Sequence, residues 1–354
     1  MQQLTSKERI SNLLKHRPVD RIGLYEHIWD STLKNWKKDG FIKENEDPVL
    51  HFGFDITEFA PFKYVADLDA GYKVIEESED KVILKDGNGV IYREYKDHVA
   101  GRQYFDFTVK ERKDWEEKIK PLIKADSKRI DFSGYRKARE FAEKHDLFFV
   151  CFGLNVFELM RSVCGHEHML VGAALDPDWI KDMAEIYSEL NINLMEMLFG
   201  QEGAPDGIWL AEDLGYKGHS FISSPMYKEL LQPAHKKITK YAHSMNIPFI
   251  MHSCGMIEEL IPELIESGID CLQGIEVKAG MDLLKLYMEY GEHLCLIGGI
   301  DTRVLISGGR KAIDKELEAK IPVVKGKYGY ILHSDHSIPD DVKYENYMYF
   351  TRKG

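Results

Sequence analysis

Short apolar runs alternate with longer stretches in which apolar residues recur three and four positions apart. The short runs lack a helical period and suit buried parallel strands, whereas the longer stretches predict amphipathic helices. The predicted strands are Ile22–Glu26, Phe52–Phe59, Leu147–Phe152, Ile208–Ala211, Phe249–Met251, Cys271–Gln273, Leu294–Ile297 and Tyr328–Leu332. About eight strands with helices between them predict an α/β protein folded as a (β/α)8 TIM barrel.

One segment, at about residues 61–132, departs from this alternation. It contains three short β-rich runs separated by turn sequences, which predict an antiparallel meander. The three runs are Tyr72–Glu76, Lys81–Lys85 and Val90–Tyr95, the last with the least certain end. We therefore expect residues 1–354 to form a single TIM-barrel domain with a β-meander and helical segment inserted in its N-terminal third.

Composition indicates a soluble globular protein. The 354 residues are 44% hydrophobic and 30% charged, with a net charge of −12. This acidic balance without a basic patch argues against nucleic acid and anionic membrane as partners, and no apolar run approaches the length of a membrane span. An odd number of cysteines, five, with no close spacing argues against a disulfide framework. We expect a cytoplasmic, reduced protein.

The clearest chemical signal follows the predicted strand Phe249–Met251. His252 and Cys254 come at its carboxyl end, and residues two apart in an extended segment point to the same side. An imidazole and a thiol that converge suit Zn²⁺, although a catalytic zinc site usually takes three protein ligands. The alternative is a buried cysteine beside a hydrogen-bonded histidine. A third ligand must come from elsewhere in the chain.

The ends of the other strands are rich in polar residues, and the active site of such a barrel lies at these carboxyl ends. The last strand is followed by three residues that could complete a zinc site, His333, Asp335 and His336. Alternatively, Ser334 and Asp335 could cap a helix near Pro339. The strand-end residues are Glu26, His27, Glu58, Asn155, Glu212, Asp213, His252, Cys254, Glu276, Asp301, His333, Asp335 and His336.

Several of these positions have two interpretations. Asp213 is either a hydrogen-bond acceptor at a helix start or a pocket carboxylate, and the same holds for Asp301, although the glycines before it allow close approach to a ligand. Four aromatic residues near strand ends could line a pocket or simply pack the barrel. These are Tyr25, Trp29, Phe152 and Trp209.

The chain resembles the uroporphyrinogen decarboxylase superfamily, and within it the corrinoid-dependent methyltransferases of the O-demethylase type. The resemblance runs from residue 5 to about 350, and its most specific element is His-x-Cys-Gly at 252–255. The matching stretches are Thr5–Arg9, Arg17–Arg21, Glu212–Gly215, Ser224-Pro225, His252–Gly255, Gly298–Asp301 and Gly329–Leu332.

The resemblance implies a TIM barrel with zinc at the strand ends. It also implies methyl transfer to or from the cobalt of a corrinoid (cobalamin) carried by a separate protein. No Asp-x-His-x-x-Gly cobalamin motif occurs in the chain itself, since Asp97–Gly101 has the wrong spacing. A decarboxylase is less well supported, because that enzyme uses arginines near its first strand and Ile22–Asp39 contains none.

One departure from the family pattern bears on the methyl donor. Many of these methyltransferases place a third ligand, a cysteine, three residues before a proline after the last strand, and here His336 stands three residues before Pro339. Two imidazoles and one thiolate leave zinc with a charge of about +1, which makes it a better Lewis acid than a neutral centre. Such a metal could activate an ether, so O-demethylation of a methoxylated aromatic compound is expected.

On this hypothesis His252, Cys254 and His336 bind zinc, and Asp213 or Glu276 orients the donor or moves a proton. The other expected contacts of the donor are Tyr25, His27, Trp29, Phe152, Trp209 and Asp301. Three alternatives stay open: a methylcorrinoid:thiol or tetrahydrofolate methyltransferase, a decarboxylase of a tetrapyrrole or other acid, and a non-catalytic corrinoid- or porphyrin-binding barrel. The oligomeric state is also open, with a homodimer among the options.

Overall fold

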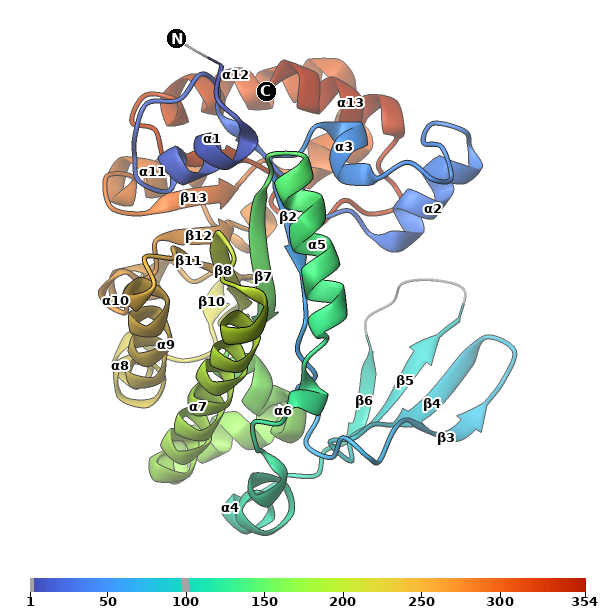
Figure 1. The fold of residues 1–354 in the computed structure, drawn as a ribbon, viewed down its shortest axis with the longest axis vertical. Coiled ribbons are helices and arrows are strands. Elements are labelled where there is room, and N and C mark those ends of the chain that lie inside the picture. Colours follow the sequence, from blue (N-terminus) through green and yellow to red (C-terminus); the bar gives the residue numbers. More distant parts are fainter. Residues whose placement is uncertain (1–2, 97–101) are drawn as a thin grey trace.

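An eight-stranded parallel sheet rolls into a nearly closed barrel in the computed structural model, which describes residues 3–96 and 102–354 (Figure 1). The α/β TIM-barrel prediction is confirmed. Each barrel strand overlaps a predicted one, because fully buried strands carry continuous apolar runs. In sheet order they are β1 (Gly23–Leu24), β14 (Tyr330–Leu332), β13 (Cys295–Gly298), β12 (Cys271–Gly274), β11 (Phe249–Ser253), β8 (Gly207–Ala211), β7 (Phe148–Leu154) and β2 (Ile56–Phe59).

Helices cover the outside of this barrel (Figure 1). Among the described residues, none of the helices combines the length and apolar character needed to cross a bilayer. The principal helices are α1 (Ser6–Leu13), α2 (Asp30–Lys38), α3 (Pro48–Phe52), α5 (Phe132–Lys144), α6 (Val156–Leu175), α7 (Pro177–Glu202), α8 (Ser224–Leu230), α9 (Gln232–Ser244), α10 (Ile261–Glu266), α11 (Leu283–Tyr290), α12 (Gly309–Val324) and α13 (Tyr344–Lys353).

Asp55 joins the two end strands of the sheet, β1 and β2, at the amino-terminal end of the barrel. Its backbone N–H donates to Leu24 O at 2.8 Å, and its carboxylate accepts the Leu24 N–H at 2.8 Å. The same fully buried carboxylate accepts hydrogen bonds from Arg9 and Arg21, each at 2.7 Å. A buried charge without partners would be very costly, so the two arginines make this position tolerable.

The inserted meander projects from the side of the barrel as a separate antiparallel sheet (Figure 1). Its first three strands confirm the prediction, but the fourth was not predicted, because four residues are too few to show a period. Residues 97–101, which include the sequence compared with the cobalamin motif, lie outside the described residues. In order, the strands are β3 (Lys73–Glu77), β4 (Lys81–Lys85), β5 (Ile91–Tyr95) and β6 (Gln103–Asp106).

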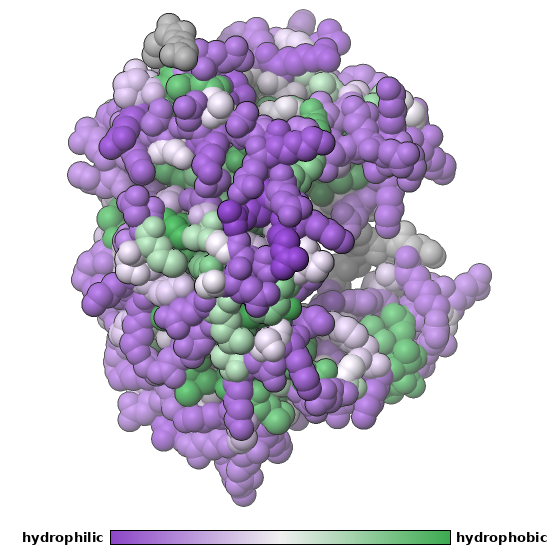
Figure 2. Space-filling view, in the orientation of Figure 1, coloured by the Kyte–Doolittle hydropathy of each residue, from purple (hydrophilic) through white to green (hydrophobic). Residues whose placement is uncertain are grey.

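Exposed hydrophobic side chains are found on both outer strands of the meander. Val74 and Ile75 on β3 and Phe105 on β6 are about half exposed, and hydrophobic surface is visible on this side of the molecule (Figure 2). The base of the insertion contacts helix α6 of the barrel, where the Val109 N–H donates to Val163 O at 3.1 Å and the Asn88 amide donates to Ser162 Oγ at 3.5 Å.

One local prediction needs correction. The strand predicted from Phe52 begins only at Ile56, because Asp47 caps a short helix, α3, with Pro48 in its first turn and Gly53 ending it in the left-handed region. After Gly255 the chain forms a 3₁₀ turn at Glu258–Leu260 that leads into α10.

We expect Asp55→Ala to lower the free energy of unfolding by about 3–5 kcal/mol, since it leaves the buried Arg9 guanidinium without its closest buried partner. Urea denaturation measures the change. As a control, Glu266→Ala removes an exposed ion pair with Lys236 and should cost no more than about 1 kcal/mol. Equal effects of the two substitutions would contradict the role assigned to Asp55.

Candidate metal centre at the mouth of the barrel

His252 and Cys254 converge at the carboxyl end of β11, as their spacing predicts. The Nε2 atom of His252 lies 3.3 Å from the Cys254 sulfur, and both side chains are partly buried. The strand carries residues 252 and 254 to the same side because it stays extended through Ser253. Two metal-binding atoms of different residues therefore face one point inside the mouth.

Asp213 is the third member of this group. In the parallel register, His252 lies opposite Ala211 of β8, so the residue two positions beyond Ala211 comes beside Cys254. The Asp213 Oδ1 atom is 3.3 Å from His252 Nε2 and accepts the Cys254 N–H at 2.9 Å. Among the described residues, Asp213, His252 and Cys254 form the cluster whose metal-binding atoms all lie within 4.8 Å of one another.

The three groups alter one another's protonation. Burial alone would raise the pKa of Asp213, but its hydrogen bond with His252 and the imidazolium charge lower the pKa to about 2. Burial disfavours the charged imidazole, yet Asp213 and Cys254 raise the pKa of His252 well above its usual value. Burial raises the pKa of the Cys254 thiol. Asp213 and His252 thus shift each other's pKa in the direction that favours an ion pair.

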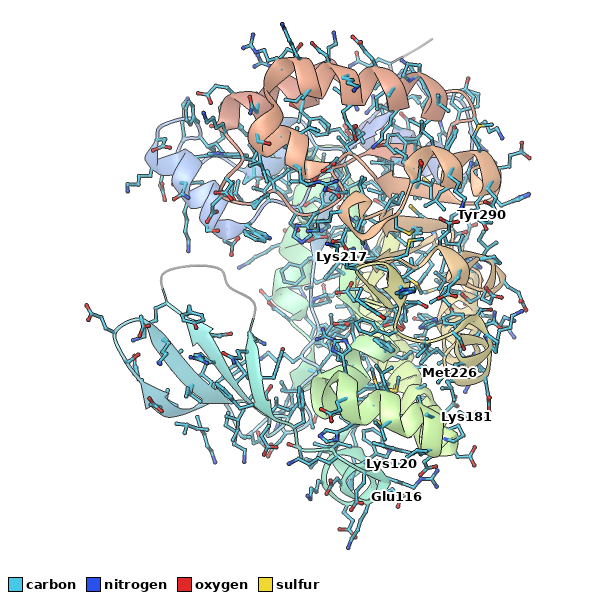
Figure 3. All side chains as sticks on the ribbon, turned by 180° about the vertical axis from the view of Figure 1, so that it is seen from behind. Glu116, Lys120, Lys181, Lys217, Met226 and Tyr290 are labelled. Atoms are coloured by element: carbon cyan, nitrogen blue, oxygen red, sulfur yellow. The ribbon has the colours of Figure 1, made fainter. Side chains whose placement is uncertain are left out.

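The turn after Cys254 is held by backbone packing. Gly255 has φ +83°, and a Cβ atom there would meet the backbone of Gly215 at 2.1 Å, so only glycine fits. Gly215 belongs to β9 (Gly215–Tyr216), which forms a hairpin with β10 (His219–Ser220) that was not predicted. Lys217, labelled in Figure 3, lies in the turn of this hairpin.

Glu276 supports the same turn from the other side. Its Oε2 atom accepts the Gly255 N–H at 2.8 Å, and its other oxygen is 3.4 Å from the Lys278 ammonium. The carboxylate therefore lies next to the centre while it holds the backbone that positions Cys254. A part for Glu276 in proton transfer stays a prediction, and the contacts show a structural task for the residue.

The last strand offers three candidate ligands, and two of them are occupied by internal contacts. His333 is fully buried, with its Nδ1 atom 3.0 Å from Glu26 and its Nε2 atom accepting the His27 N–H at 3.3 Å. Asp335 accepts the N–H groups of Val277 at 3.0 Å and Thr302 at 2.9 Å. Both residues stabilise loops at the barrel mouth.

His336 is differently placed. It is partly exposed, its Nδ1 atom is 3.1 Å from the carbonyl oxygen of Ser337, and its ring meets the Trp29 ring edge-on at 6.1 Å. A carbonyl can only accept, so Nδ1 carries the proton and Nε2 presents its lone pair. His336 is not part of the cluster of Asp213, His252 and Cys254, and its part as a zinc ligand stays a prediction.

His27, three residues after the end of β1, forms a pair with Glu58 of β2. His27 Nε2 is 3.2 Å from the Glu58 carboxylate, and His27 Nδ1 is 3.2 Å from His333 Nε2. Burial alone would raise the pKa of Glu58, but the charge and hydrogen bond of His27 lower it. An ionised carboxylate thus faces the mouth of the barrel beside the imidazole. Glu58 had no assigned role in the sequence-based hypothesis.

The aromatic residues predicted to contact the donor lie at two depths. Tyr25 and Trp209 are almost fully buried, with ring centroids 5.6 Å apart, and both rings pack against the imidazole of His27. Phe152 and Trp29 are partly exposed. This burial favours packing for Tyr25 and Trp209 over direct stacking on a donor.

Asp301, the remaining predicted contact, is engaged within its own turn. Its carboxylate pairs with Arg303 at 2.7 Å and also accepts the Arg303 N–H at 3.0 Å. Its pKa is lowered, because this pairing outweighs the opposing effect of burial. The structure does not bring Asp301 into the cluster of Asp213, His252 and Cys254.

The donor atoms of the cluster fit zinc. A tetrahedral site with Zn–S of about 2.3 Å and Zn–N or Zn–O of about 2.0–2.1 Å requires its ligand atoms to lie roughly 3.3–3.6 Å apart. The observed separations from His252 Nε2 are 3.3 Å to Cys254 Sγ and 3.3 Å to Asp213 Oδ1. Imidazole, thiolate and carboxylate are all common ligands of this ion.

Comparisons with known proteins place the chain in one family. A segment of 93 residues is 29% identical to the methylated-thiol–coenzyme M methyltransferase of Methanosarcina mazei, and it spans 25% of this chain and 23% of that relative. The fold resembles that of a solved methyltransferase from Methanosarcina mazei, with a TM-score of 0.66 and 14% identity over 99% of this chain and 98% of the other. The uroporphyrinogen decarboxylase (URO-D) family model matches residues 150–353, more than half of the chain. The chain therefore belongs to the uroporphyrinogen decarboxylase family.

Proposed function

We propose that the protein is a zinc-dependent methyltransferase that moves a methyl group from a small methylated donor to the Co(I) of a corrinoid held by a separate protein. The observation that carries the proposal is the convergence of His252 Nε2, Cys254 Sγ and Asp213 Oδ1 at the ends of adjacent barrel strands. Family membership supports it, because the relative that shares the 93-residue segment is named as a methyltransferase.

His252 and Cys254 would hold zinc through Nε2 and Sγ, and the bound ion would supply a Lewis acid next to the donor's heteroatom. Asp213 fixes the backbone of Cys254, and Glu276 fixes that of Gly255. In the transfer, the bond between the methyl carbon and the heteroatom breaks, and the electron pair of Co(I) forms the new bond to the methyl group. The heteroatom leaves with the electron pair of the broken bond and takes a proton from water.

The third ligand decides the charge of the centre. With His336, one thiolate and two imidazoles leave zinc at about +1, which favours attack on an ether. With Asp213, the thiolate and the carboxylate neutralise the ion, which suits a thiol or thioether substrate better. We propose His336, because its Nδ1 contact leaves Nε2 available, whereas His333 and Asp335 are held by other groups.

We propose a methoxylated aromatic compound as the donor. The partly exposed rings of Phe152 and Trp29 offer aromatic contacts at the mouth, with Trp29 next to His336. Tyr25 and Trp209 would support His27 from below. A methylated thiol, such as a thioether, is the second candidate donor, favoured by the name of the matched relative and by the presence of Asp213 beside His252.

The purified protein should contain about one zinc ion per chain, and His252→Ala and Cys254→Ala should each lose it, because either change removes a ligand. Elemental analysis of protein prepared without chelators measures the content. His243→Ala, which alters an exposed histidine paired with Asp270, serves as the control and should keep its zinc. Full zinc content in both ligand variants would contradict the site.

The identity of the third ligand can be tested by zinc affinity. His336→Ala should weaken binding by more than the ~10–100-fold typical of losing a partner outside the ligand set, whereas Asp213→Asn should have a smaller effect, since an amide oxygen still accepts the Cys254 N–H. Competition with a chromogenic chelator gives both values. A larger loss of zinc affinity in Asp213→Asn than in His336→Ala would assign Asp213 as the third ligand and favour a methylated thiol or thioether as the donor.

Free cob(I)alamin can stand in for the corrinoid protein in an activity assay. We expect methoxylated benzoates or phenols to convert it to methylcobalamin in the presence of the zinc-loaded protein, with the absorbance spectrum of the cobalt as readout. Cys254→Ala should lower the rate by more than about 100-fold, because it removes the metal. Transfer from dimethyl sulfide but not from any methoxy compound would overturn the proposed donor, and absence of transfer from both would overturn the reaction.

A further inference from the structure

Gln273 connects His252 of the candidate metal centre to His333, the residue that follows β14. It lies on β12 directly opposite His252 in the parallel register, so the two side chains share the interior face of the sheet. Its Oε1 atom is hydrogen-bonded to His252 Nδ1, and its Nε2 atom is 3.4 Å from His333 Nε2. The side chain is 2% exposed, and nothing in the sequence-based hypothesis included it.

The protonation of His333 follows from a backbone contact. The His27 N–H can only donate, and it points at His333 Nε2 at 3.3 Å, so this nitrogen is an acceptor. The other nitrogen, Nδ1, is 2.5 Å from the carbonyl oxygen of Ser334, which can only accept. Because Nε2 accepts a hydrogen bond, the ring is neutral, in the same direction as burial, which lowers the pKa of His333. A neutral His333 therefore carries its one proton on Nδ1.

This assignment orients the amide of Gln273. An acceptor at His333 Nε2 requires the NH₂ group of Gln273 on that side, which leaves the amide oxygen facing His252 Nδ1. The oxygen can only accept, so His252 Nδ1 must carry a proton. The lone pair available for a metal is then on His252 Nε2, the atom that faces Cys254 and Asp213.

We infer that Gln273 is a positioning residue that fixes the metal-binding tautomer and the ring orientation of His252. The inference rests on the proposed function insofar as it takes zinc to be the ion that His252 binds. Histidine ligands of zinc usually donate their other ring N–H to an oxygen acceptor, and loss of that acceptor typically weakens metal binding by about 10–100-fold. Here the acceptor is itself held by a chain of contacts that begins at the His27 backbone.

The test compares zinc affinity in variants of Gln273, measured by chelator competition at one neutral pH. Gln273→Met keeps the length and approximate volume but removes both hydrogen bonds, and we expect about 10–100-fold weaker binding. Gln273→Glu keeps an oxygen that accepts from His252 Nδ1 and should bind zinc within about threefold of the wild type. Long-range ¹H–¹⁵N spectra of the histidines should show the Nδ1–H form of His252 in the zinc-loaded wild type.

The control is Gln232→Met, which removes another buried amide, one that donates to Glu263 O at 3.0 Å and not to a residue of the centre. It should leave zinc affinity unchanged, and thermal unfolding of the metal-free proteins shows which variants are folded. Wild-type affinity in Gln273→Met, or a loss in Gln273→Glu equal to that in Gln273→Met, would overturn the inference.

A failure of the role proposed for Gln273 can be distinguished from a failure of the proposed function. If the wild type binds no zinc, or if Cys254→Ala keeps it, the metal site itself is wrong. If zinc is lost in Cys254→Ala but bound normally by Gln273→Met, the site stands and only the role of Gln273 is wrong. Should Gln273→Met not fold, the tautomer of His252 in wild-type spectra decides, because an Nε2–H form would contradict the inference.

Discussion

The parallel register of β8, β11 and β12 determines what meets at the mouth of the barrel. His252 lies opposite Ala211 on one side and Gln273 on the other. Because side chains alternate along a strand, this alignment places His252 and Gln273 on the interior face and carries Cys254 and Asp213 to the same level. A shift of one residue in either pairing would send these groups to opposite faces of the sheet. The chemistry of the centre thus depends on the hydrogen bonds of three strands.

The two ends of the barrel use buried charge in different ways. At the amino end, Asp55 is fully compensated by Arg9 and Arg21 and joins β1 to β2. At the carboxyl end, Asp213 and Cys254 raise the pKa of His252, and a bound cation would displace its proton. In barrels of this kind the amino end usually serves stability and the carboxyl end function, and the compensated Asp55 and the cluster of Asp213, His252 and Cys254 follow that division.

Much of the barrel could be predicted from sequence because its strands are buried apolar runs between amphipathic helices. Two other elements could not be predicted from sequence. Strand β6 is too short to show a period, and the hairpin of β9 and β10 is defined by the packing of Gly215 on Gly255.

At the site, the i, i+2 spacing of His252 and Cys254 was sufficient to predict their convergence. The proximity of Asp213 depended on a strand register that one sequence does not reveal, and Gln273 carries neither charge nor a metal-binding atom typical of zinc. The buried positions of Tyr25 and Trp209 could not be distinguished from exposed ones, since aromatic residues near strand ends serve both packing and binding.

X-ray absorption at the zinc edge of the purified protein examines the proposed metal centre directly. We expect a four-coordinate ion with one sulfur at about 2.3 Å, from Cys254, and nitrogen or oxygen neighbours at about 2.0–2.1 Å. Outer-shell scattering from two imidazoles would identify His252 and His336 as ligands, whereas scattering from a single imidazole would identify His252 with Asp213. A first shell without sulfur, or a protein without zinc, would rule out a zinc site at Cys254.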